Sequence, residues 1–182
     1  MLHFQEPGRN NPVSPDAKIP DPAYGMALDH LVIACVDVIF THQSQVLLVK
    51  RNRYPHPSWW IVGGRMVAGE EPKQTAIRKA AAEIGIQTLE AASLRYVGTY
   101  STCFAFRQQV PQDHGSHTLN ITFHAELTSS ERKQMRLYPN EHTTWQWVKL
   151  NQLEQILDRS QVMDQALLRI MQDLQTLQVI PI

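Results

Sequence analysis

The distribution of hydrophobic and polar residues along the chain predicts a mixed α/β protein. Six segments have the length and the content of β-branched and aromatic residues that are typical of strands. They span residues 31–40, 45–50, 59–62, 94–106, 119–127 and 144–148. Residues 41–44, between the first two segments, are short and polar enough to form a hairpin turn.

Helical spacing of apolar residues occurs in the remaining segments. Residues 72–84 place alanine and isoleucine side chains on one helical face, begin with a proline that suits a first turn, and are followed by Gly85 as a stop signal. A short helix is predicted over residues 24–29, and one or two amphipathic helices after Leu150. The simplest packing of these elements is a mixed sheet sandwiched between helices, in three α/β/α layers.

The first part of the chain is rich in proline. Five of the eleven prolines lie within residues 1–22. Proline has no backbone N–H and is poorly tolerated inside helices and sheet ladders. We therefore expect residues 1–22 to form a loose N-terminal arm and residues 23–182 to form a single domain.

Composition narrows the classes of function. Seventeen Lys and Arg balance seventeen Asp and Glu, so the net charge is zero and a general nucleic-acid binder is not expected. The longest apolar run, residues 31–40, is far shorter than the roughly 20 residues that span a bilayer. The N-terminus has no basic segment followed by an apolar one, so we expect neither a signal peptide nor a membrane partner. Two cysteines, Cys35 and Cys103, cannot build a disulfide framework, which favours a cytoplasmic protein.

One stretch of 23 residues carries a specific motif. Its glycines, acids and arginine stand at the spacing of the signature of the Nudix hydrolases, which the stretch resembles. The matching positions are Gly64, Glu70, Arg78, Glu83, Gly85 and Ile86. The resemblance implies a Nudix-like fold, with Glu70, Arg78 and Gly85 as structural residues of the motif.

The same resemblance implies a metal site. A Gly-Gly turn at the end of a strand can expose the Gly64 carbonyl, and carboxylates such as Glu83 suit a hard cation on a diphosphate. The expected cofactor is therefore Mg²⁺, with Mn²⁺ as an alternative. Two signature glutamates are replaced, however, by Lys79 and Ala82. Lys79 stands four residues before Glu83, so the two side chains can pair. On the general Nudix template the chain is predicted to be inactive.

The GDP-mannose mannosyl hydrolase branch of the family also lacks these two glutamates and keeps an alanine directly before the last one, and the chain resembles this branch elsewhere as well. The segments that carry this resemblance are residues 36–39, 50–55, 59–65 and 139–147. That branch attacks the anomeric carbon of a nucleotide sugar, so that the nucleoside diphosphate and the free sugar are released by C–O cleavage. The partner is then a small nucleotide-sugar substrate, and relatives of this branch form dimers, which leads us to expect a homodimer.

This resemblance assigns roles residue by residue. The Gly64 carbonyl, Glu83 and Glu141 hold the metal, and His142, in a polar loop, is the general base for water. Arg51 and Arg65 neutralise phosphate oxygens during catalysis, and both bind substrate. Asp37, which interrupts an apolar strand, and Arg53 complete the substrate-binding set.

Two other functions stay open on the sequence alone. One is P–O cleavage of a nucleoside diphosphate derivative, with Glu83 and Glu141 sharing the metal. The other is a degenerate module that binds a nucleotide without turnover, which the residues Lys79 and Ala82 favour. Residues 50–69 carry four basic side chains and no acidic one, which indicates a small cationic site in any of these cases.

Overall fold

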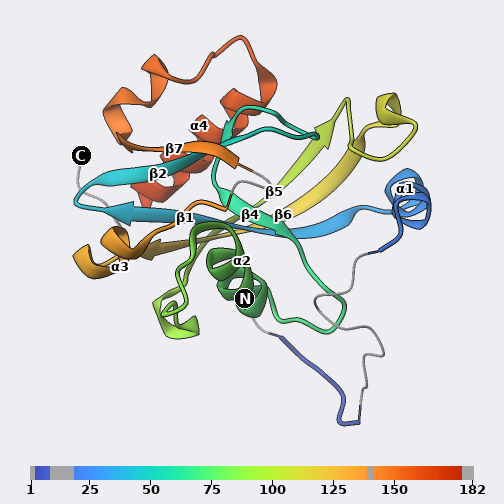
Figure 1. Cartoon of the computed structure of the whole chain (residues 1–182), viewed down its shortest axis with the longest axis horizontal. Coiled ribbons are helices and arrows are strands. Elements are labelled where there is room, and N and C mark those ends of the chain that lie inside the picture. The colour runs from blue at the N-terminus through green and yellow to red at the C-terminus, as the bar shows by residue number, and fades with distance from the viewer. Residues whose placement is uncertain (1–2, 9–18, 139–141, 178–182) are drawn as a thin grey trace.

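The computed structural model describes residues 3–8, 19–138 and 142–177 of the chain. Figure 1 shows a twisted sheet with helices on both faces. The strands are β1 (Ile33–His42), β2 (Gln45–Arg51), β3 (Trp59–Trp60), β4 (Val62–Arg65), β5 (Arg95–Phe104), β6 (Ser116–Glu126) and β7 (His142–Lys149). The helices are α1 (Asp21–His30), α2 (Pro72–Ile84), α3 (Ser129–Gln134) and α4 (Val162–Thr176), with short 3₁₀ turns at Ala91–Ser93, Gln112–His114 and Leu150–Gln155.

The sheet is mixed, and β1 lies at its centre. β1 pairs in parallel with β6 and antiparallel with β4, and its last residues form a hairpin with β2. β5 pairs antiparallel with β6, while β2 carries β3 and β7 as antiparallel partners. Because β1 pairs with β2, β4 and β6, residues that are distant in sequence lie close together around this strand.

Alternating side chains of β1 and β2 supply two separate cores. Val36, Val38 and Phe40 pack toward α2, whereas Ile39 packs with Leu167 and other residues of α4. This period of two is what a strand between two helical layers requires. The predicted α/β/α sandwich is therefore confirmed. No helix among the described residues is long and apolar enough to cross a membrane.

Several boundaries differ from the sequence-based expectation. The first hairpin turn is shorter than predicted, because Gln43 and Ser44 alone form it, both with positive φ (47° and 62°). The predicted strand 59–62 is two strands, since β3 pairs with β2 and β4 pairs with β1. α1 begins at Asp21, inside the proposed arm, because proline in a first helical turn leaves no N–H unpaired.

Helix α3 was not predicted. Its signal was nevertheless present as a capping box, in which Thr128 accepts a hydrogen bond from the backbone of Glu131 and the Glu131 side chain accepts one from the backbone of Thr128. A six-residue helix has too few apolar positions for a helical period to be recognised in the sequence. The capping box was therefore the available sequence signal for this helix.

Gly85 ends α2 in the left-handed region, with φ 72° and ψ 12°, and its N–H donates to Ala80. A Cβ here would lie 3.6 Å from atoms of Arg136, which is an ordinary contact distance. The loss of stability on substitution therefore comes from the left-handed backbone conformation alone. We expect Gly85→Ala to lower the free energy of unfolding by about 1 kcal/mol. Gly85→Asn should lose less, because asparagine tolerates this conformation. Urea denaturation of both variants checks the ranking, and equal stability of Gly85→Ala and the native chain would contradict it.

Candidate active site

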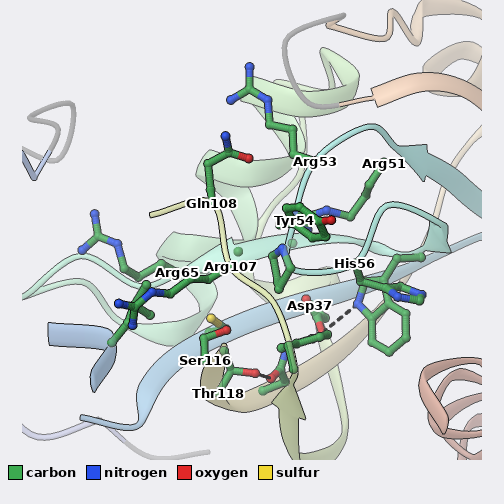
Figure 2. Close-up of a pocket in the computed structure, with 18 of the residues that line it drawn as sticks. Asp37, Arg51, Arg53, Tyr54, His56, Arg65, Arg107, Gln108, Ser116 and Thr118 are labelled. Atoms are coloured by element: carbon green, nitrogen blue, oxygen red, sulfur yellow. Dashed lines mark hydrogen bonds between the residues drawn. The ribbon is translucent and has the colours of Figure 1, made fainter. Parts of the chain in front are cut away.

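A cavity of about 460 Å³ opens at one end of the sheet, bordered by α1, β1, β4, α2 and the segments after β2 and β5. In Figure 2, Arg65 and Arg107 lie on the left of this pocket, Arg51 and His56 on its right, and Asp37 between them. The pocket therefore collects residues from across the chain, and its volume lies within the range of small-molecule sites.

Positive charge dominates the pocket lining. Among the described residues, the lining includes six basic side chains, Arg51, Arg53, Arg65, Arg78, Lys79 and Arg107, and one carboxylate. Three of the six pair with carboxylates outside the lining: Arg78 with Glu70, Lys79 with Glu83 and Arg107 with Asp29. The pocket is thus suited to an anion that carries more than one negative charge.

Asp37 is the one carboxylate of this lining, and it is 3% exposed. Its Oδ2 accepts hydrogen bonds from Asn120 Nδ2 at 2.8 Å and from Trp60 Nε1 at 3.4 Å. Asn120 Oδ1 accepts in turn from Thr118 at 2.6 Å and Thr102 at 3.1 Å. Burial raises the pKa of Asp37 to about 6, although these hydrogen bonds oppose the rise. Asp37 is therefore hydrogen-bonded and also faces the pocket.

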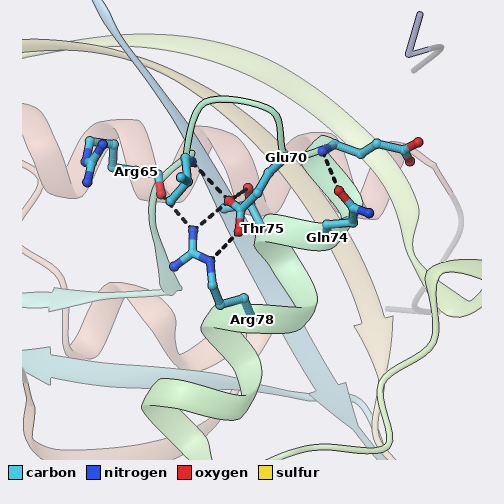
Figure 3. A network of polar contacts seen from close by, with 7 residues as sticks. Arg65, Glu70, Gln74, Thr75 and Arg78 are labelled. Atoms are coloured by element: carbon cyan, nitrogen blue, oxygen red, sulfur yellow. Dashed lines mark hydrogen bonds and ion pairs between the residues drawn. The ribbon is translucent and has the colours of Figure 1, made fainter. Parts of the chain in front are cut away.

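Glu70 and Arg78 join the loop after β4 to helix α2, as Figure 3 shows. Arg78 donates from Nη2 to Glu70 Oε2 at 2.8 Å and to the Arg65 carbonyl at 3.1 Å. Glu70 also accepts from the Val67 N–H and the Thr75 hydroxyl. Burial raises the pKa of Glu70, but these donors outweigh it and hold the pKa below its ordinary value. The pair fixes the backbone at the end of β4, where Arg65 lies, and the loop that follows.

Glu83 lies buried behind the pocket between two partners. Its Oε1 forms an ion pair with Lys79, and its Oε2 accepts a hydrogen bond from His142 Nε2 at 2.8 Å. Burial raises the pKa of Glu83, but the hydrogen bond from His142 and the charge of Lys79 outweigh it, and the pKa stays below its ordinary value. Since an ionised carboxylate only accepts, the Nε2 of His142 is the donor of this hydrogen bond.

His142 does not lie in an exposed polar loop, as the sequence suggested. It is the first described residue of β7, is 1% exposed, and lies opposite Arg51 at an irregularity of the β2–β7 ladder. The ladder places the residue in the sheet, where its side chain reaches Glu83 instead of the pocket. Its role as general base stays a prediction. Glu141, its neighbour and the third predicted metal ligand, lies outside the described residues.

A comparison with known families agrees with this architecture. The model described as NUDIX domain matches residues 30–170. The chain belongs to the Nudix family. Solved Nudix structures with similar folds include a MutT NUDIX hydrolase from Burkholderia pseudomallei, with TM-score 0.59 and 20% identity over 76% of this chain and 98% of that one. Another is the NUDIX domain of Shewanella oneidensis NrtR, complexed with ADP ribose, with TM-score 0.57 and 16% identity over 80% of this chain and 89% of that one.

A curated Nudix relative is the NAD-capped RNA hydrolase NudC of Pseudomonas aeruginosa, 30% identical over 94 residues. The matched region is 52% of this chain and 29% of the relative, so the chain spans less than a third of that protein's length. Nudix hydrolases act on nucleotide substrates and generally use divalent metal ions such as Mg²⁺. The finer resemblance to the mannosyl hydrolase branch stays a prediction.

Two of the three predicted metal ligands of this Nudix site, Gly64 and Glu83, lie among the described residues. No group of three or more His, Cys, Asp or Glu residues within the described part of the chain is arranged to hold a metal. Both oxygens of Glu83 are engaged, by Lys79 and by His142. The Lys79 ammonium also lies so close to Gly64 that a Cβ there would stand 3.1 Å from its Nζ. The structure therefore brings the two predicted metal ligands, Gly64 and Glu83, near the same side chain, and that side chain is Lys79.

Some residues of the Nudix pocket were missed by sequence analysis. Asn120 and Trp60 hold Asp37, and Arg107 is a buried basic residue of the lining whose Nη1 donates to Asp29 at 2.6 Å. Tyr24 of α1 stacks under Arg65, with its ring centre 5.3 Å from the guanidinium carbon. Single Asn, Trp, Arg or Tyr residues carry no spacing signal, so no pattern in the sequence indicated them.

The raised pKa of Asp37 has a consequence for stability. Its carboxyl ionises near pH 4 in the unfolded chain and near pH 6 in the folded protein, so folding stability falls as pH rises through this interval. We expect Asp37→Asn to raise the free energy of unfolding at pH 7 by about 3 kcal/mol, with the gain vanishing near pH 4. The asparagine oxygen still accepts from Asn120 and Trp60.

Urea denaturation at a series of pH values measures this difference. Asp113→Asn is the matched control, since Asp113 is exposed in a 3₁₀ turn and its replacement should leave stability unchanged at every pH. A stability gain for Asp37→Asn that is the same at pH 4 and pH 7 would show that ionisation of Asp37 is not its cause.

Proposed function

We propose that the protein hydrolyses a nucleoside-diphosphate sugar and releases the nucleoside diphosphate and the free sugar by C–O cleavage. One observation carries the proposal: a single pocket combines basic side chains with a floor of hydroxyl, amide and carboxylate groups around Asp37. These groups match the two parts of such a substrate. The diphosphate needs positive charge, and the sugar needs hydrogen-bond donors and acceptors.

The arginines are suited to the diphosphate. Arg51, Arg53 and Arg65 line the pocket, and no ion pair involving them is found among the described residues. The Nε of Arg51 is buried and has no hydrogen-bond partner in the described part of the chain. An unmatched buried donor is costly, and a phosphate oxygen would satisfy it with a charge-assisted hydrogen bond.

The other groups of the pocket suit the sugar and the base. Asp37, Asn120 and Thr118 offer acceptors and donors for sugar hydroxyls. Tyr54 and Phe104 add aromatic surface, on which a nucleobase can stack. The curated relative, named for NAD-capped RNA, acts on another compound in which a diphosphate joins a nucleoside to a ribose.

The pocket favours C–O over P–O cleavage. In C–O cleavage, water adds to the anomeric carbon and loses a proton, while the electron pair of the breaking bond stays with the departing diphosphate. Negative charge thus develops on the leaving group, where Arg51 and Arg65 can stabilise it. P–O cleavage relies on water activated by a carboxylate-bound metal, and helix α2 offers Lys79 and Ala82 at two carboxylate positions of the motif. Mg²⁺ or Mn²⁺ stays an expectation from the family, and the proposal is argued from the chain's own cations.

Two residues are candidates for the base that accepts the proton from water. Asp37 faces the pocket, and its pKa of about 6 leaves it ionised at neutral pH. His142, the sequence-based candidate, faces Glu83 in this structure. We expect kcat to rise with pH through about 6 and then level off, and this step to disappear in Asp37→Asn. Loss of the step in His142→Gln, with Asp37→Asn unaffected, would return the assignment to His142.

Product analysis tests the reaction itself. A panel of ADP-, GDP- and UDP-sugars is incubated in ¹⁸O-labelled water, and the products are identified by mass spectrometry. We expect ¹⁸O in the free sugar and an unlabelled nucleoside diphosphate. Label in a phosphate, together with a nucleoside monophosphate, would contradict C–O cleavage and support the P–O alternative. Arg51→Gln should lower kcat/KM about a hundredfold, whereas the exposed Asp113→Asn should leave it unchanged.

A binding module without turnover is the second candidate. The observation in its favour is the Lys79–Glu83 ion pair, which takes up a carboxylate that the motif assigns to a metal. Tight binding of a nucleotide sugar with no product, in the presence of either Mg²⁺ or EDTA, would establish this function in place of hydrolysis.

A further inference from the structure

We propose that the ammonium group of Lys79 takes the place of a divalent cation, so that the protein binds the diphosphate of its substrate without a metal ion. This inference rests on the proposed function, because it concerns the same pocket and the same diphosphate. It is carried by the position of Lys79 between the pocket, Glu83 and Gly64.

Lys79 is held in position from several sides. It lies on α2 one turn before Glu83, and the two side chains are 12% and 4% exposed. The ammonium pairs with Glu83 Oε1, while the far side of that carboxylate accepts the hydrogen bond of His142. Lys79 also belongs to the pocket lining, and its chain end packs against Gly64. A positive charge is thus fixed at the border between the buried carboxylate and the pocket.

The same arrangement disfavours a metal at this point. A Mg²⁺ ion needs oxygen ligands at about 2.0–2.1 Å in a nearly ideal octahedron. Here one oxygen of Glu83 faces an ammonium and the other faces an N–H donor. A metal on Glu83 would have to displace Lys79 or His142 and lie beside a like charge. The ammonium carries one charge and three N–H donors, which are suited to phosphate oxygens.

The ion pair also explains why Lys79 tolerates its partial burial. A buried ammonium is unfavourable unless an opposite charge compensates it, and Glu83 supplies that charge. Glu83 stays ionised because its two partners hold its pKa low. A diphosphate that enters the pocket would therefore meet Lys79 together with Arg51 and Arg65, which line the same pocket.

Calorimetric binding of ADP, GDP and UDP to the full chain tests the inference, in excess EDTA and in Mg²⁺. We expect at least one of the three to bind in EDTA with an affinity that Mg²⁺ changes less than threefold. The double variant Lys79→Met/Glu83→Gln removes both charges and leaves no buried carboxylate unpaired, so it should fold. Its affinity should fall about ten- to a hundredfold, the size expected for one charge-assisted hydrogen bond.

Lys133→Met is the matched control, because Lys133 is exposed on α3 and its replacement should leave nucleotide affinity unchanged. Circular dichroism and thermal melting confirm that each variant is folded. Binding by the double variant that equals that of the native chain overturns the inference. Binding by the native chain that requires Mg²⁺ also overturns it, and leaves the proposed function standing. No binding in either solution overturns both.

A second measurement uses the metal alone. Mn²⁺ titrations followed by electron paramagnetic resonance should show at least tenfold weaker binding to the native chain than to Lys79→Glu. That variant places two carboxylates one turn apart on α2 and removes the ammonium. Its nucleotide binding should depend on Mn²⁺. Equal Mn²⁺ affinity of the native chain and Lys79→Glu would show that Lys79 does not occupy the position of a cation.

Discussion

The burial of the ionised Glu83 carboxylate is the constraint on which the site depends. A charge in the interior must be compensated, and here helix α2 supplies Lys79 and strand β7 supplies His142. The hydrogen bond from His142 links residues 59 positions apart and joins the helical layer to the strand that pairs with β2. Removal of either partner would leave this buried charge with only one of its two compensating contacts. The carboxylate that the family motif assigns to metal binding is therefore also a structural element of this chain.

Local signals account for what the sequence predicted well. The strands of the sheet, the boundaries of α2 and its Gly85 stop follow from hydrophobic period, proline and glycine, all of which act between near neighbours. The same holds for the contact between Glu70 and Arg78, eight residues apart, whose spacing was visible as a motif. Where a structural feature is caused by residues within about two helical turns of each other, the sequence alone is enough to predict it.

Contacts between distant segments account for what the sequence could not predict. Asn120 reaches Asp37 because β1 and β6 pair in parallel, with Cys35 opposite Asn120 in the register. Tertiary contacts also divide the predicted strand 59–62 into β3 and β4. Its first two residues pair with β2, whereas Val62 and the residues after it pair with β1. His142 is expected in a polar loop for the same reason: a Glu-His pair in a polar stretch gives no sign that a ladder will bury the histidine.

The two carboxylates of the site differ in a way that separates their chemistry. The hydrogen-bond donors to Asp37 are neutral, and burial raises its pKa to about 6 although these donors and the charge of Arg51 oppose the rise. Glu83 accepts a hydrogen bond from His142 and faces the charge of Lys79, so its pKa falls although it is similarly buried. The first can therefore exchange a proton near neutral pH, whereas the second stays charged and holds a cation in place. One position is suited to proton transfer and the other to charge neutralisation, and the proposed C–O cleavage needs both.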